Sequence, residues 1–291
     1  MDIRAILMGL AFAVMWSSAF TSARIIVASA PPLTALSLRF LVSGIFGVLI
    51  ALALRQSWRL TRPQWRATII FGICQNALYL GMYFMAMRTV EASLAAIIAS
   101  TMPLLVGLAS WALLGQRIGL VGGMGLVAGV IGVGIIMGSR LQGGADLYGV
   151  GLCIGGVLAL TLATLAVRGA TSGGNFLMIV GLQMLVGSVA LGVVGLSFEP
   201  LVIDWSWQLI AAFIYTTLIP GLAATLVWFK LVNRIGAIKA ATFHFLNPFL
   251  GVAIAAVILG ENLGLTDMVG VAMVMAGILA VQLSRQKQAP A

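Results

Sequence analysis

Long apolar runs constrain this chain more than any other feature of its sequence. Each run has about 20 residues, the length that an α-helix needs to cross the apolar core of a bilayer. Charged residues make up only 8% of the 291 positions, whereas a soluble domain carries about 25%. Membrane β-strands are about half as long and alternate in polarity, so the runs predict an all-α integral membrane protein. Ten helices are expected near residues 5–27, 33–54, 66–87, 91–114, 118–138, 147–167, 176–197, 206–229, 237–259 and 265–284.

The distribution of charge predicts how these helices are oriented. Cytoplasmic loops of membrane proteins are enriched in Lys and Arg. If the N-terminus is cytoplasmic, most of the 16 basic residues lie in cytoplasmic loops, including Arg117 and Arg168, and all seven acidic residues except Asp2 lie on the other side. We therefore expect both termini in the cytoplasm. The net charge of +9 is spread along apolar segments and forms no continuous basic face, which argues against a nucleic-acid partner.

A repeat with an offset of 145 residues runs through the chain. It divides the sequence into a first five-helix repeat at 1–143, a second at 144–284 and a cytoplasmic tail at 285–291. Because five is odd, the second repeat enters the membrane from the opposite side. Inverted repeats around a site near the bilayer midplane are typical of secondary transporters, and a complete repeat within one chain favours a functional monomer. The aligned pairs include Pro103 with Pro248, Gly115 with Gly260, Gly125 with Gly270, and Gly132 with Gly277.

Two stretches resemble the EamA-type repeat of the drug/metabolite transporter superfamily. In the first, Glu91-Ala92-Ser93-Leu94-Ala95-Ala96 leads to Pro103 and then to Leu114-Gly115-Gln116-Arg117. In the second, Ala240-Ala241 leads to Asn247-Pro248 and then to Leu259-Gly260-Glu261-Asn262, and Leu38-Arg39-Phe40 also resembles the family. The chain as a whole is similar to YddG-type exporters of aromatic and other amino acids. That resemblance implies ten helices around one central cavity, in the cytoplasmic (inner) membrane of a bacterium.

Polar and aromatic side chains within the spans are the candidate substrate ligands, because polar groups are costly in a membrane. Aromatic walls with scattered hydrogen-bonding groups suit an amphipathic or aromatic small molecule. The alternative is that the hydroxyls bond their own helix backbone and that the aromatic rings pack in the protein interior. The substrate-binding candidates are Trp16, Asn76, Tyr79, Tyr83, Ser100, Trp228, His244 and Asn247.

Two prolines and one arginine suggest roles in mechanism. Pro103 and Pro248, paired by the repeat, each remove a helix N–H and are predicted to act as hinges or as static kinks. Pro220 has no proline partner, since Gln75 stands at its equivalent position. Arg39 lies a short way into the second helix, where it either holds a substrate carboxylate or reaches the membrane surface or the end of a neighbouring helix.

These features predict a secondary transporter that exports aromatic and other neutral amino acids by alternating access. The alternatives are efflux of cationic drugs or other metabolites, and flipping of a lipid carrier. Hydrolase, metalloprotease and nucleotide-binding motifs are missing, so an enzyme is not expected. Cys74 and Cys153 lie in apolar stretches, and we expect neither a metal nor a cofactor. His244 is the single histidine, and because no acidic residue lies deep in a span, facilitated export is favoured over proton coupling.

Overall fold

The computed structural model of the chain is helical throughout the part that it describes, which comprises residues 2–116, 118–142, 144, 146–167 and 173–288. Within those residues ten helical segments are long and apolar enough to cross a membrane, and no strand occurs. This confirms the expected fold class. Arg117, Arg168, the residue expected to end the first repeat at 143 and the last residues of the tail, 289–291, lie outside the described residues.

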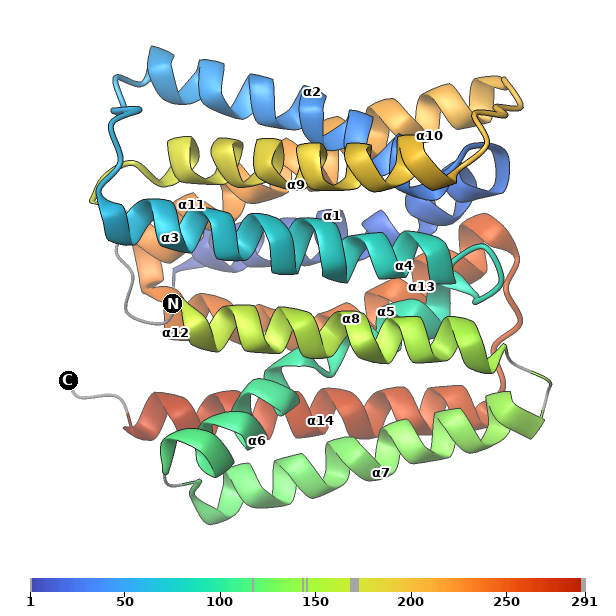
Figure 1. Cartoon of the computed structure of the whole chain (residues 1–291). Helices are drawn as coiled ribbons and strands as arrows, with labels where there is room; N and C mark the ends of the chain where they lie inside the picture. Colours follow the sequence, from blue (N-terminus) through green and yellow to red (C-terminus); the bar gives the residue numbers. More distant parts are fainter. Residues whose placement is uncertain (1, 117, 143, 145, 168–172, 289–291) are drawn as a thin grey trace. The chain divides into compact units, whose positions relative to one another are not determined.

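The helices follow from the apolar runs, because a bilayer leaves every backbone N–H and C=O to be satisfied within the protein. Figure 1 labels most of them. In chain order they are α1 (Ile3–Ser29), α2 (Pro32–Ala53), α3 (Arg62–Phe71), η1 (Gly72–Tyr79), α4 (Leu80–Ala86), α5 (Ala92–Ser100), α6 (Met102–Leu114), α7 (Leu120–Gln142), α8 (Leu147–Ala166), α9 (Phe176–Phe198), α10 (Trp207–Leu218), η2 (Ile219–Ala223), α11 (Ala224–Ile235), α12 (Ala237–Ala241), η3 (Thr242–Leu246), α13 (Asn247–Leu259) and α14 (Leu265–Gln288).

Four of the ten spans are interrupted: the breaks beside Pro103 and Pro248 fall where kinks are predicted, whereas the two π-helical segments are not predicted from the sequence. The span at 62–86 contains the π-helix η1, and the span at 207–235 contains the π-helix η2. The span at 92–114 divides into α5 and α6, and the span that ends at Leu259 begins with α12 and the 3₁₀-helix η3. Segments 145 residues apart are therefore interrupted in corresponding places, although only one of the two π-helices contains a proline.

Two helix ends differ from the sequence prediction for local reasons. The third span begins four residues early, at Arg62, because Thr61 and Gln64 form a reciprocal capping box. The eighth span continues to Ile235 and stops at Gly236, which has φ 81°. Such a positive φ is readily adopted by glycine alone, so the helix ends there rather than at the predicted residue 229.

The chain packs into two compact units. Unit 1 comprises Met1–Thr21, Thr89–Gly151 and Ala223–Ala291, and unit 2 comprises Ser22–Arg88 and Leu152–Leu222. Each unit draws on both halves of the sequence, and the chain passes from one unit to the other within continuous helices such as α1. This division concerns packing, and the repeat boundaries stay a prediction.

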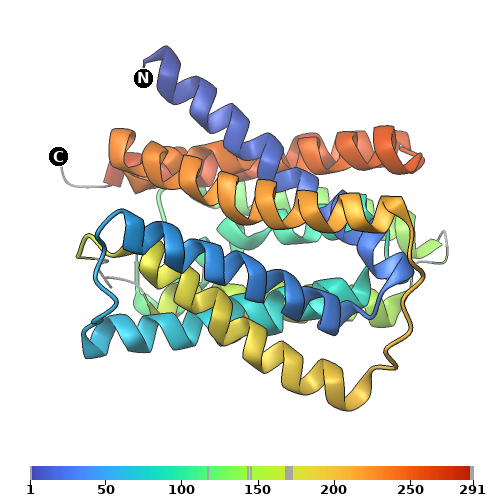
Figure 2. The ribbon, with the colours of Figure 1, turned by 90° about the horizontal axis from the view of Figure 1, so that it is seen from above.

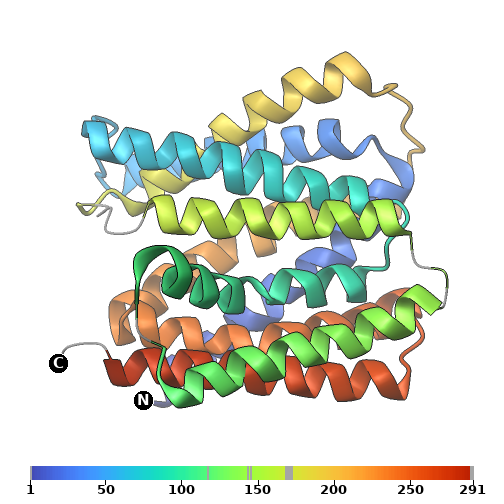
Figure 3. The same cartoon turned by 60° about the horizontal axis from the view of Figure 1, so that its bottom comes forward.

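In unit 1, α7 and α14 lie side by side and run antiparallel (Figures 1 and 3). A Cβ added to Gly125 would lie 2.8 Å from the carbonyl oxygen of Gly277, and one added to Gly132 would lie 2.7 Å from that of Gly270. The added Cβ atoms of Gly270 and Gly277 would meet Gly132 and Gly125 in return, at 2.7 and 2.6 Å. Small residues thus allow the two backbones to approach closely.

In unit 2, α2 and α9 form a second antiparallel pair (Figure 2). The Ser37 hydroxyl donates to the Ser188 carbonyl at 2.8 Å, and the Ser188 hydroxyl donates to the Ser37 carbonyl at the same distance. A Cβ on Gly181 would lie 2.8 Å from the backbone nitrogen of Val48. At one end of the pair, the Glu199 carboxylate accepts the backbone N–H of Leu33, at 2.8 Å.

Candidate functional site

An aromatic cluster in unit 1 gathers three of the eight candidate ligands. Phe12 on α1 lies at its centre, with ring centroids 5.6 Å from Trp16, 4.7 Å from Trp228 and 5.3 Å from His244. The Trp228 and His244 rings are 5.1 Å apart. Because Phe12 and Trp16 are four residues apart, they share one face of α1. Phe12 is buried, whereas Trp16, Trp228 and His244 are each partly exposed, so they retain ring surface for a ligand.

A polar pair adjoins these rings. The Asn247 side-chain amide donates to Nδ1 of His244 at 2.9 Å, because η3 ends immediately before Asn247 and brings the two side chains into register. An accepting Nδ1 places the proton of a neutral imidazole on Nε2. The Ser17 hydroxyl on α1 lies 3.4 Å from the Asn247 carbonyl oxygen. These contacts hold the imidazole in one orientation beside the aromatic rings.

Unit 2 holds the other group of candidates, on η1 and α4. The Asn76 side-chain amide donates to the Gln183 carbonyl of α9 at 2.9 Å, so it joins two helices. Tyr79 and Tyr83 pack with ring centroids 4.7 Å apart, and both are buried. A Cβ on Gly156 of α8 would lie 3.0 Å from the Tyr83 ring. These side chains form a close-packed part of unit 2, and their contact with substrate stays a prediction.

The remaining candidates are engaged in local helix structure. The Ser100 hydroxyl donates to the Ala96 carbonyl of its own helix at 2.7 Å, which is the common behaviour of a helical serine. Pro103 and Pro248 are expected in the middle of continuous helices. Instead, they lie in the first turns of α6 and α13, directly after an interruption. Proline is favoured there, since the first helical N–H groups have no helical acceptor. Hinge motion at these positions stays a prediction.

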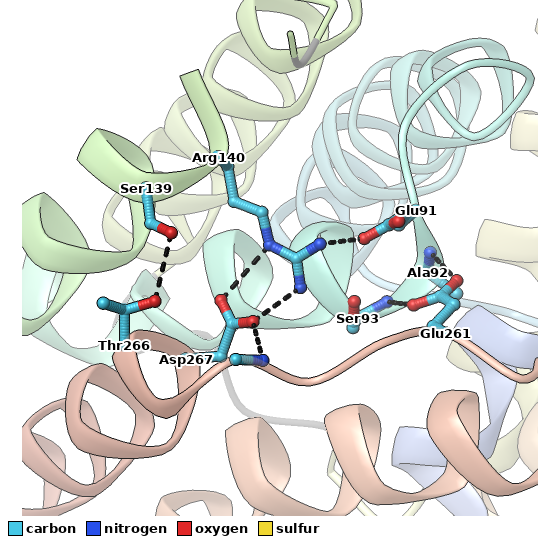
Figure 4. Close-up of polar contacts among 9 residues, drawn as sticks. Glu91, Ala92, Ser93, Ser139, Arg140, Glu261, Thr266 and Asp267 are labelled. Carbon is cyan, nitrogen blue, oxygen red and sulfur yellow. Dashed lines mark hydrogen bonds and ion pairs between the residues drawn. The ribbon is translucent and has the colours of Figure 1, made fainter. Parts of the chain in front are cut away.

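A charged network at one end of unit 1 was missed by the sequence analysis (Figure 4). Arg140, at the end of α7, pairs with Glu91 and donates to both carboxylate oxygens of Asp267, at 3.2 and 3.0 Å. Glu261 accepts the backbone N–H of Ala92 at 2.7 Å at the start of α5. The signal available in the sequence was that these residues are all predicted to lie on the same, non-cytoplasmic side.

Comparison with known proteins agrees with this architecture. The model of the EamA-like transporter family matches the chain twice, at residues 3–138 and 147–283. The chain is 26% identical to the uncharacterized transporter YvbV of Bacillus subtilis (strain 168), over 94% of this chain and 90% of that protein. It is 25% identical to the protein PecM of Dickeya dadantii (strain 3937), over 88% and 86% of the two chains. The names of these two relatives specify no substrate.

One solved crystal structure superposes on this fold with a TM-score of 0.70 at 20% identity, covering 99% of this chain and 100% of the other. At that identity the likeness concerns the fold alone. The family match covers both halves and nearly the whole chain, and the curated relatives that carry a functional name are transporters rather than enzymes. This chain is therefore a multi-pass membrane protein that belongs to the EamA-like transporter family of the drug/metabolite transporter superfamily.

Proposed function

We propose that the chain exports aromatic and other neutral amino acids across the cytoplasmic membrane of a bacterium, with both termini in the cytoplasm. The observation that carries the proposal is the cluster of Phe12, Trp16, Trp228, His244 and Asn247 in unit 1. Partly exposed rings bind an apolar or aromatic side chain, and an oriented imidazole and amide supply hydrogen bonds. The sequence resemblance to YddG-type exporters points to the same substrate class.

Alternating access is the mechanism that the packing supports best. The contacts between α7 and α14 are reciprocal: Gly125 meets Gly277, and the residues 145 positions away from each, Gly270 and Gly132, meet one another. Such exchange of contacts is what a two-fold axis produces, and the antiparallel direction of the pair requires that axis to lie in the membrane plane. An inverted repeat of this kind allows two halves to exchange conformations.

Facilitated export agrees with the positions of the acidic residues. Six of the seven lie outside the ten spans, and the seventh, Asp267, lies at the start of the last span and pairs with Arg140. Asp267 is buried but is held by Arg140 at the end of the span, which disfavours a proton relay through it. His244 is the group through which coupling to protons would act.

Efflux of cationic drugs or metabolites is the second candidate, because the same rings would attract an ammonium group through cation–π contacts. Flux of amines in preference to amino acids would favour it. The flipping of a lipid carrier is the further alternative, and no feature of the cluster favours it.

The decisive experiment uses purified protein in liposomes with radiolabelled phenylalanine and a panel of unlabelled amino acids, with and without a pH gradient. We expect saturable flux without a gradient. Trp228→Ala should lower flux several-fold, since aromatic pairs contribute about 0.5–1.5 kcal/mol each. The matched control is Trp111→Ala, which removes a tryptophan that is 54% exposed on α6 of the same unit. Equal flux in the two variants would exclude the cluster as the site.

A further inference from the structure

Arg39 is a buried cation in the apolar part of unit 2. It lies on α2 with 6% of its surface exposed. Its Nε donates to the Thr216 carbonyl of α10 at 3.3 Å, and its Cζ lies 5.1 Å from the centre of the Phe40 ring. A Cβ on Gly221 would lie 3.6 Å from one of its terminal nitrogens, Nη2. The side chain therefore does not reach the membrane surface, but it does contact the end of a neighbouring helix, since Thr216 lies in the last turn of α10.

The interruption of the neighbouring helix explains the contact with Thr216. In an α-helix the Thr216 carbonyl would accept the N–H of residue 220, but that residue is proline and has none. Ser43, one turn after Arg39 on α2, donates its hydroxyl to the next carbonyl, that of Thr217, at 3.3 Å. Arg39 and Ser43 thus support two successive carbonyls beside the π-helix η2.

Support for a carbonyl does not require a positive charge. The neutral hydroxyl of Ser43 does the same for Thr217, whereas a charged side chain within a span is expensive and is normally paired. Unit 2 contains two acidic residues. Glu199 accepts the backbone N–H groups of Leu33 and Thr34 at the start of α2, and Asp204 is exposed in the loop before α10.

Arg39 forms no ion pair with any residue that the structure describes. Its recorded hydrogen bond uses Nε alone. The planar guanidinium binds a carboxylate through two parallel N–H donors, and the Nη groups retain that capacity. The missing counter-charge therefore has one natural source in a transporter, namely the transported molecule.

We propose that Arg39 forms a subsite in unit 2 that binds the carboxylate of the transported molecule during its passage, a contact that does not require simultaneous contact with the rings of unit 1. The proposal rests on the proposed function, because it assigns the α-carboxylate of an exported amino acid to this residue. Binding replaces an uncompensated buried cation with an ion pair, while the Nε contact with Thr216 keeps the guanidinium in place.

The experiment measures how well unlabelled compounds compete with labelled phenylalanine in proteoliposomes. L-Phenylalanine is compared with phenylethylamine and phenylalanine amide, which lack the carboxylate. For the unmodified protein we expect phenylalanine to compete about tenfold better or more, the range for hydrogen bonds to a charged group. Arg39→Gln keeps a donor for Thr216 but removes the charge, and should bring the ratio close to one. Arg39→Lys should retain part of the preference.

Ser43→Ala is the matched control, since it removes the neighbouring carbonyl contact without changing the charge, and it should keep the full preference. An unchanged ratio in Arg39→Gln overturns the subsite while the proposed function stands. If that variant does not fold by size-exclusion chromatography, Arg39→Lys decides: equal losses for phenylalanine and for the two analogues overturn the subsite. If the unmodified protein transports amines but no carboxylate-bearing compound, the subsite and the amino acid assignment both fail.

Discussion

Asn247 is the residue on which the orientation of the imidazole in unit 1 depends. It is 7% exposed, and its amide donates to Nδ1 of His244. Asn247→Leu should lower the free energy of unfolding by about 1–2 kcal/mol, because the partly buried Nδ1 of His244 loses its donor. Thermal unfolding in detergent measures this change, and Asn262→Leu, in the exposed loop before α14, is the control. A melting temperature equal to that of the control would show that the pair contributes nothing.

Asp2 gives a pH dependence with a definite sign. Its hydrogen bond with Arg234, together with the N–H of Ala5, lowers its pKa from 3.8 to about 2. The folded state therefore favours the carboxylate, and this stabilisation is fully present above pH 3.8 and is lost as the pH falls through about 2. We expect the difference in melting temperature between the unmodified protein and Asp2→Asn to shrink as the pH falls from 3.8 to about 2 and to vanish below that pH. An undiminished difference at pH 2 would contradict the assignment.

At the scale of single residues, sequence reasoning found His244 and Asn247 but not Phe12. His244 and Asn247 are three residues apart, so they share one face both in an α-helix and in the observed 3₁₀-helix. Phe12 gave no signal, because phenylalanine is common in membrane helices. Its partners Trp228 and His244 are also more than 200 residues away in the sequence. Asn76 is predicted as a substrate ligand, and that role stays a prediction; its side-chain amide donates to the Gln183 carbonyl on another helix, a contact that the sequence does not indicate.

Helix termini in both units depend on glutamates that belong to a neighbouring segment. Glu199 follows α9 and accepts N–H groups at the start of α2, and Glu261 follows α13 and does so at the start of α5. Each carboxylate faces the positive end of a helix dipole. Glu199→Ala should cost about 1–2 kcal/mol. Asp204→Ala, in the same connection, is the control for thermal unfolding, and equal melting temperatures would contradict the capping role.

The close contact of α7 with α14 predicts a sharp difference between glycines of one helix. Gly125→Ala would place a Cβ 2.8 Å from a backbone carbonyl, whereas Gly134→Ala meets nothing within 4 Å. We expect the first variant to lose about 1–3 kcal/mol through overpacking. The second should be neutral or slightly stabilising, since alanine is the better helix former. Chemical or thermal unfolding of the two variants in one detergent tests the contact, which equal stabilities would refute.

The ten spans could be predicted from apolar runs alone, because a bilayer imposes the length of each helix. The interruptions could be predicted only in part, because prolines mark three of them but do not specify the kind of helix that forms there. In a π-helix or a 3₁₀-helix each N–H bonds to an acceptor one position away from the acceptor that it would use in an α-helix. Packing against neighbouring helices determines which acceptor is used. Pro220 gave one such signal, but η1 contains no proline, so its interruption had no signal in the sequence.

For the whole molecule, the charge distribution predicts which face of the membrane each terminus occupies. Because Lys and Arg concentrate in cytoplasmic loops, a fluorescent protein fused after residue 291 should fluoresce in a bacterial host, and alkaline phosphatase fused there should be inactive. The reverse pattern would overturn the orientation. A matched fusion in the loop between α9 and α10, which is predicted to face outward, should give the opposite result to the C-terminal fusion.

The crosswise glycines of α7 and α14 have a consequence for how such a chain can be built. The glycines of each helix meet those of the other helix in both directions, so the covalent connection between them raises their local concentration without having to determine how they pack. A chain cut between the two helices would retain both faces of this contact. Co-expressed fragments should therefore associate through the same close contact of the two backbones. In the intact chain the linker only raises the local concentration, and the glycines determine how the helices pack.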